Sequence, residues 1–144
     1  MVELIMVMVI VGIMAAVVAP RFLDTNAFKS RGFADQVQAT LRYAQKEAIA
    51  QHRNVCVAMT ATQISLTIAN SSGVGIACLP NLDLPTGGNT IPSPPGSGIT
   101  LAYNLAGFVF DALGRNTSAQ IVISVSGATN NIVVETETGY VHSP

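Results

Sequence analysis

The chain has 144 residues, of which 49% are hydrophobic and only 10% charged, and its formal net charge is -1. About a quarter of the residues of a soluble globule are charged, so part of this chain is suited to an apolar environment. The length allows one small domain, and the lack of excess basic residues argues against nucleic acid as the main partner.

Residues 4–19 contain no polar side chain, and no charge lies between Glu3 and Arg21. With the first residues included, the apolar run reaches about 18–19 residues, the short end of the roughly 17–25 that span a bilayer core. A cleavable secretory signal is the alternative, but it needs a basic start, and this chain opens Met-Val-Glu. We therefore predict a transmembrane helix over residues 1–20.

Glu3 stands at the edge of this apolar run. The simplest reason for its presence is that the helix dipole favours an acid in the first turn. Inside a bilayer, however, its ionisation would cost roughly 2.5–3.5 kcal/mol, so the carboxylate needs a partner that this helix cannot supply. The α-amino group of a parallel neighbouring helix, offset along the axis, would be such a partner, and Glu3 would then set the register of assembly.

This segment resembles the N-terminus of type IV pilins and type II secretion pseudopilins, because Glu3, Gly12 and Pro20 match that pattern at one constant offset. The resemblance implies that Glu3 sets filament register, Gly12 weakens the helix and Pro20 kinks it. Family members begin with a methylated Phe, usually followed by Thr, and both are missing ahead of Glu3. We expect the mature chain to begin about two residues before Met1, behind a leader removed by prepilin peptidase, or its start to be wrongly assigned.

Beyond Pro20, apolar residues recur at spacings of three and four, which predicts an amphipathic helix over residues 21–53 that covers a globular core. The core stripe consists of Phe33, Val37, Leu41, Ala44 and Ala48. The opposite face carries Asp35, Gln38, Arg42, Gln45 and Lys46, which we interpret as ordinary solvated surface.

Residues 54–144 are rich in short runs of β-branched residues, which predict strands joined by antiparallel hairpins. The runs are 55–57, 64–68, 99–101, 109–110, 121–123 and 132–134. Residues 80–98 hold five prolines and four glycines, so we expect a long loop there, either exposed and functional or partly disordered. The predicted fold is α+β, with one long helix packed on an antiparallel sheet.

Residues 108–115, 121–127, 132–135 and 138–142 resemble the C-terminal domain of H-type pseudopilins, including minor subunits of the mannose-sensitive haemagglutinin pilus. The resemblance implies a minor pilin or H-type pseudopilin, inserted in the bacterial inner membrane and then assembled with other subunits by a pilus machinery. Its β-rich domain would be periplasmic or at the cell surface. The alternatives are a major pilin, or a membrane-tethered periplasmic binding module or enzyme that uses the helix only as an anchor.

The sequence shows no catalytic motif, and we expect no enzyme activity, cofactor or metal. A zinc site from His52, Cys56, Cys78 and His142 would match no familiar ligand spacing. A Cys56–Cys78 disulfide is the simpler interpretation and would stabilise by roughly 3 kcal/mol, with two buried thiols as the alternative. Some related minor pilins hold DNA through basic C-terminal residues, but residues 140–144 contain none, so DNA binding is not expected.

Overall fold

The computed structural model describes residues 2–22, 25–73 and 77–144, and the side chains of residues 17–22 and 25 lie outside the description. The described chain begins with two helices and continues with short strands. The helices are α1 (Val2–Phe22) and α2 (Thr25–Gln51). The strands are β1 (Val55–Thr60), β2 (Gln63–Ala69), β3 (Cys78–Asn81), β4 (Thr90–Pro92), β5 (Leu101–Tyr103), β6 (Gly107–Phe110), β7 (Ile121–Val125), β8 (Ile132–Val134) and β9 (Val141–His142).

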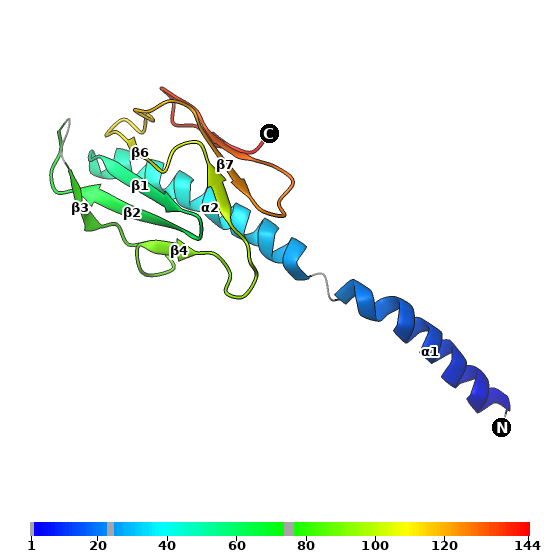
Figure 1. The fold of residues 1–144 in the computed structure, drawn as a ribbon. Coiled ribbons are helices and arrows are strands. Elements are labelled where there is room, and N and C mark those ends of the chain that lie inside the picture. Colours follow the sequence, from blue (N-terminus) through cyan, green and yellow to red (C-terminus); the bar gives the residue numbers. More distant parts are fainter. Residues whose placement is uncertain (1, 23–24, 74–76) are drawn as a thin grey trace.

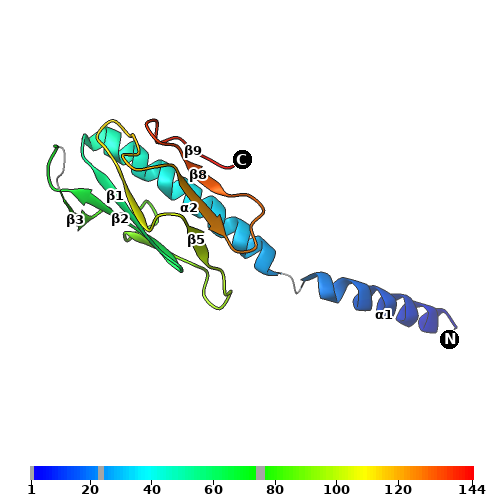
Figure 2. The ribbon, with the colours of Figure 1, turned by 45° about the horizontal axis from the view of Figure 1, so that its top comes forward.

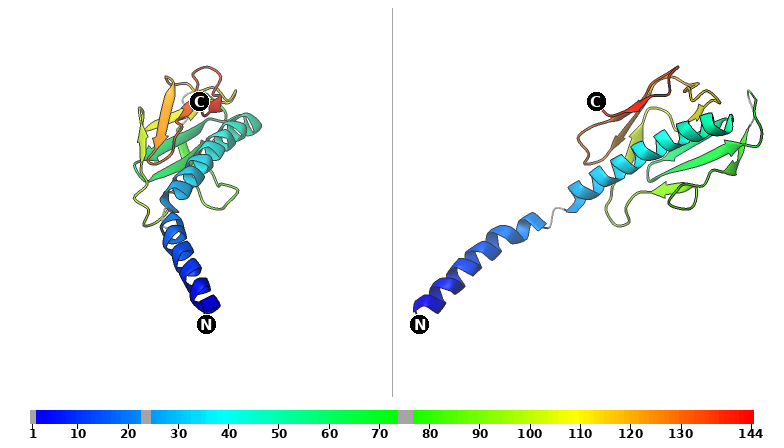
Figure 3. Two further views of the ribbon diagram at one scale, coloured as in Figure 1. Left: turned by 90° about the vertical axis from the view of Figure 1, so that its right-hand side faces the viewer. Right: turned by 180° about the vertical axis from the view of Figure 1, so that it is seen from behind.

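The two helices form the long axis of the molecule, with α1 extending beyond the globular part and α2 lying within it (Figures 1 and 3). The helical backbone runs through Pro20 and ends at Phe22, so the helix does not stop at the proline. The side chain of Pro20 lies outside the described residues, and a kink there stays a prediction. At the other end of α2, His52 adopts a positive φ of 51° and Arg53 N donates to Ala48 O at 3.1 Å. This geometry closes the helix in the way a C-terminal glycine usually does.

The strands form two antiparallel sheets, where the sequence had suggested one (Figures 1 and 2). The first has the order β3-β2-β1-β6, with β4 also paired to β2, and the second has the order β5-β7-β8-β9. Asn116 links them, because it bridges to Phe110, the last residue of β6 in the first sheet, and to Thr136, which follows β8 of the second. Its buried side chain accepts a hydrogen bond from Ser118 N and donates one to Ala119 O, so no polar atom there is left unpaired.

The predicted stripe on α2 is the centre of the core. Phe33, Val37, Leu41, Ala44 and Ala48 are at most 2% exposed. These side chains are part of the hydrophobic core between the helix and the two sheets. The helix α2 contacts β1, β2, β6, β7 and β9. Full burial of one large apolar side chain stabilises a fold by about 1.5–3 kcal/mol, so this stripe accounts for much of the stability of the domain.

The Pro- and Gly-rich segment 80–98 differs from the expected loop. It contains the end of β3 and all of β4, and it buries Leu82, Leu84 and Ile91. β4 pairs with β2 from Thr90 to Pro92, at the edge of the sheet, where a proline is tolerated because its missing N–H faces outward. Single apolar residues between turn residues therefore anchor this segment to the core.

Candidate assembly interface

α1 carries an apolar surface that no other described part of the chain covers. Every described side chain from residue 2 to residue 16 is exposed, and the large hydrophobic ones are 54–74% exposed. Leaving this much apolar area in water is unfavourable by roughly 25 cal/mol per Å². A continuous exposed apolar surface of this kind marks a site of contact with membrane or protein.

Glu3 lies in the first turn of α1, at the end of the molecule farthest from the sheets (Figure 1). Among the side chains that the structure describes, no cation lies within salt-bridge distance of its carboxylate.

Gly12 lies in the middle of α1 with open space around it, since a Cβ placed there would meet no atom within 4 Å. Nothing within the described chain requires a glycine at this position, so its predicted role in helix flexibility stays a prediction. Among the described residues, no helix is both long enough and apolar enough to cross a membrane.

On the outer face of α2, Asp35, Arg42 and Lys46 are exposed as expected, but the C-terminal segment packs against part of this face. Arg42 donates from Nε and from one terminal nitrogen to Val141 O in β9, each at 3.1 Å. Gln45 Nε2 donates to Gly114 O and to Thr138 O, each at 3.0 Å. Two residues interpreted as solvated thus hold the last strand and two turns against the helix, and hydrophobic periodicity carried no signal for these contacts.

The turns held by Gln45 also require glycine. Gly114 has φ +77° and a Cβ there would meet Ile49 Cδ1 at 2.6 Å, while Gly139 has φ +63° and a Cβ there would collide with Gly114 O. The backbones of the two turns therefore approach too closely for any side chain between them.

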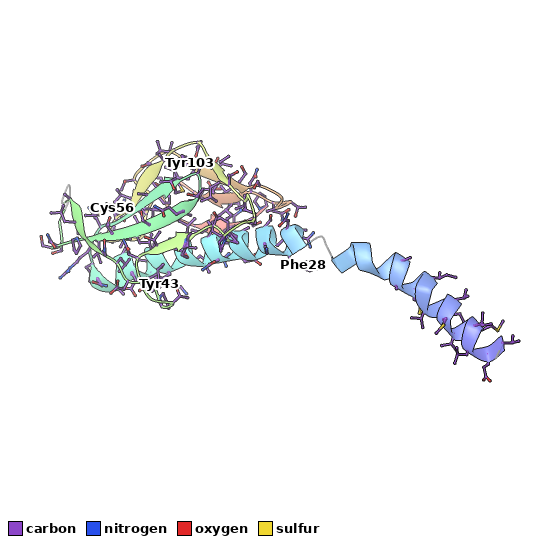
Figure 4. The ribbon with its side chains drawn as sticks, turned by 60° about the horizontal axis from the view of Figure 1, so that its bottom comes forward. Phe28, Tyr43, Cys56 and Tyr103 are labelled. Carbon is purple, nitrogen blue, oxygen red and sulfur yellow. A yellow bond between two sulfur atoms is a disulfide. The ribbon has the colours of Figure 1, made fainter. Side chains whose placement is uncertain are left out.

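Cys56 and Cys78 form a disulfide, with Cα atoms 6.0 Å apart. It connects β1 to β3 across the intervening strand β2, and the bonded pair leaves neither thiol of this chain free. Figure 4 places Cys56 on the globular part, far from α1. Because both cysteines are in the disulfide, neither can serve as a thiolate ligand in the zinc site considered from the sequence. The described residues hold no group of three or more metal-ligating side chains.

The pKa values of two carboxylates, Asp111 and Glu135, are lowered from their ordinary values. Partial burial acts to raise the pKa of Asp111, but hydrogen bonds from the backbone and side chain of Arg115 and from Leu113 N outweigh it, and the net pKa is lowered. The Arg115 side chain approaches Asp111 Oδ2 at 2.8 Å, so the pair fixes the turn that carries Gly114. The pKa of Glu135 is lowered by hydrogen bonds from His142, 3.0 Å away, and from Gln120.

Two surface grooves flank α2. One of about 390 Å³ lies between the helix and the turn after β7, and is lined by polar groups that include Arg31, Asp35 and Asn130. The other, of about 150 Å³, is mainly apolar and lies between Tyr43 and the 84–91 segment. Neither is lined by a described His, Lys or Cys, although Asp35 and Ser143 line the first and Tyr43 lines the second.

Comparison with known sequences identifies the family. Residues 34–139 match the sequence profile described as "Type II transport protein GspH". The chain belongs to the GspH family. The matched range begins one residue after Phe33 in α2 and includes strands of both sheets, so it contains almost the whole globular part. No curated protein matches this GspH-family chain.

Solved structures share the fold of this GspH-family protein. The minor pilin FimU of Pseudomonas aeruginosa matches with a TM-score of 0.61 and 14% identity over 83% of this chain and 91% of that chain. The minor pseudopilin EpsH of the type 2 secretion system of Vibrio cholerae matches with a TM-score of 0.59 and 12% identity, over 80% and 94%. The predicted α+β fold and the predicted family are thereby confirmed.

Proposed function

We propose that this chain is a structural subunit, a minor pilin or H-type pseudopilin, that is inserted in the bacterial inner membrane and then assembled into a helical filament. It acts through subunit contacts and not through catalysis. Family membership supports this proposal, and so does the likeness of the fold to FimU and EpsH.

The observation that carries the proposal is the exposed apolar surface of α1. The described side chains of this helix pack on nothing within the chain, although the domain beyond it has a complete core of its own. A helix of this kind can be stored in a bilayer and transferred to a bundle of like helices, because both environments are apolar. The continuous apolar sequence of residues 4–19 supports the membrane-inserted state before assembly.

Within the bundle, Glu3 is proposed to pair with the terminal amine of a neighbouring subunit. Gly12 and Pro20 are proposed as the points at which the rod bends or unwinds during transfer from membrane to filament. Processing by prepilin peptidase and extraction by the assembly machinery follow from the family pattern at Glu3, and both belong to this proposal.

Two other functions predict different behaviour. A major pilin would form most of the filament mass, so copy number separates it from a minor subunit. A membrane-tethered binding module or enzyme would remain with the membrane and would not depend on Glu3.

The test is fractionation of cells that express the full-length chain together with the other subunits. We expect the protein in the membrane fraction before assembly is induced and in sheared filaments afterwards, at a small share of the filament mass. Permanent retention in the membrane, with filaments present but free of this chain, would contradict the proposal.

A further inference from the structure

Strand β3 is attached to the fold without any buried side chain. Among the strands that the structure describes, each of the others contains at least one buried residue, whereas the residues of β3 are exposed or half-buried. Leu79, in the middle of β3, is 73% exposed. A strand is stabilised mainly by the packing of its side chains, so β3 gains little from the core.

The backbone pairing of β3 is also small. It pairs with β2 at two positions, Thr67 with Asn81 and Ala69 with Cys78, and the register shifts between them. Pro80 has no N–H to contribute to the pairing. Exposed backbone hydrogen bonds add little net stability, because water competes for the same groups. A segment held in this way belongs to the part of a fold that opens locally.

The disulfide supplies the attachment that packing does not. Cys78 is the first residue of β3, and Cys56 lies in β1 between Val55 and Val57, which are at most 2% exposed. β1 pairs with β2 on one side and with β6 on the other. The bond therefore ties a weakly held edge strand to a firmly packed central one.

The chain on either side of β3 is anchored without the disulfide. Ala69 is fully buried, and its N–H donates to Asn54 O at 2.8 Å. Leu82 is 6% exposed, and its N–H donates to Leu66 O at 3.2 Å. The described residues between these two anchors, 70–73 and 77–81, are all exposed or half-buried. Separation of β3 from β2 would thus leave the core as it is.

We propose that the Cys56–Cys78 bond is a redox latch, which holds β3 on the sheet when oxidised and releases it when reduced, while the rest of the domain stays folded. This inference goes beyond the proposed filament function and does not depend on it. The reductant is a dithiol, which can reach the bond because both cysteines are half-buried and not enclosed.

The exchange proceeds in two balanced steps. One thiolate of the dithiol attacks a sulfur of the bond and forms a mixed disulfide, and its second thiolate then displaces the remaining protein thiolate. Two electrons and two protons pass to the protein, which gains two thiols, and the dithiol becomes a disulfide.

The latch controls one edge of the first sheet. β4 covers β2 only from Gln63 to Ser65, so release of β3 uncovers the backbone of β2 at residues 67–69. An unpaired strand edge is a template for pairing with another chain. An oxidising compartment sets the latch and closes this edge, and a reducing one opens it.

The test is hydrogen exchange of the full-length chain in detergent micelles, with and without dithiothreitol, with thiol counting to confirm reduction. We expect the peptide that contains Leu79 and Asn81 to exchange about tenfold faster or more after reduction, and β7 to be unchanged. The double variant Cys56→Ser, Cys78→Ser should show the fast β3 exchange without reductant. Ile123→Val is the control for general destabilisation, since it removes a buried methyl group from β7. It should speed exchange in β7 and leave β3 at its oxidised rate.

Three results would overturn the inference. Unchanged exchange of β3 in the fully reduced chain would mean that pairing with β2 is sufficient. Equal acceleration in β3 and β7 would mean that the bond supports the whole fold. A bond that dithiothreitol reduces only in denaturant would not be a latch in the native chain. None of these results concerns incorporation into filaments, so the proposed function is tested separately.

Discussion

Gly139 is a residue whose replacement should be unusually costly, because both its backbone angle and its surroundings exclude a side chain. We expect Gly139→Ala to destabilise the domain by about 2–5 kcal/mol, from left-handed strain plus overpacking against the Gly114 carbonyl. Gly88→Ala is the matched control, since Gly88 has φ +69° with open space around it. It should cost only about 1–2 kcal/mol. Equal losses in chemical denaturation would show that the contact between the two turns contributes nothing.

Asp111 should make stability depend on pH. Its native pKa is lowered below the ordinary 3.8, so the unfolded chain binds the proton more readily and the ionised carboxylate stabilises the fold above that value. This stabilisation is lost as the pH falls through the lowered native pKa. We expect the advantage of the natural chain over Asp111→Asn to be constant well above the ordinary pKa of 3.8 and to shrink as the pH falls below it.

The measurement for this prediction is thermal unfolding at a series of pH values. Asp35→Asn provides the comparison, because the exposed Asp35 makes no hydrogen bond or ion pair among the described residues. A difference between the natural chain and Asp111→Asn that did not change with pH would mean that the turn is held by geometry and not by charge.

Residues whose role depends on spacing along the chain were predictable, and residues whose role depends on distant contacts were not. The buried stripe of α2 followed from its period. The Cys56–Cys78 bond followed from there being only two cysteines, and the structure contains it. Gln45, in contrast, contacts carbonyls 69 and 93 residues away, and no local pattern reports such partners.

Among the elements, the strands formed by runs of β-branched residues were predicted, whereas β3, β4 and β9 were missed. Strands β3, β4 and β9 contain only two to four residues each, and they exist because tertiary pairing with β2 and β8 outweighs weak local preference. The expected strand at 99–101 lies at Leu101–Tyr103 instead, where β7 provides the partner. The apolar contact surface proposed on α1, in contrast, was predictable from the sequence alone.

The hydrophobic core contains no described residue of α1, so the globular domain should fold without this helix. Removing roughly the first 25 residues should leave a soluble, folded and monomeric domain, because the core stripe begins at Phe33. Circular dichroism and sedimentation should show a cooperative, single-copy domain, and a cleanly unfolded product would mean that α1 is part of the core.

The whole molecule combines a folded domain with an apolar rod that has no partner among the described residues, and this division is what a filament subunit requires. Burying the rods of adjacent subunits against each other would stabilise the assembly without specifying their offset, since apolar packing is non-directional. A charged group within the bundle would specify it, because only one offset brings the carboxylate and an amine together in a low-dielectric region. We propose Glu3 as this acid.

The most direct test is to replace Glu3 by Val and to measure incorporation into filaments with natural partner subunits present. Removal of a charge from an apolar helix should make membrane insertion easier, by up to about 2.5–3.5 kcal/mol, so folding and insertion should be retained. The ratio of variant in sheared filaments to variant in the membrane should fall at least tenfold relative to the natural chain. Val2→Ala, a change beside Glu3 that keeps the acid, should leave the ratio unaltered. Equal incorporation of Glu3→Val and the natural chain would contradict the proposal that Glu3 sets the register.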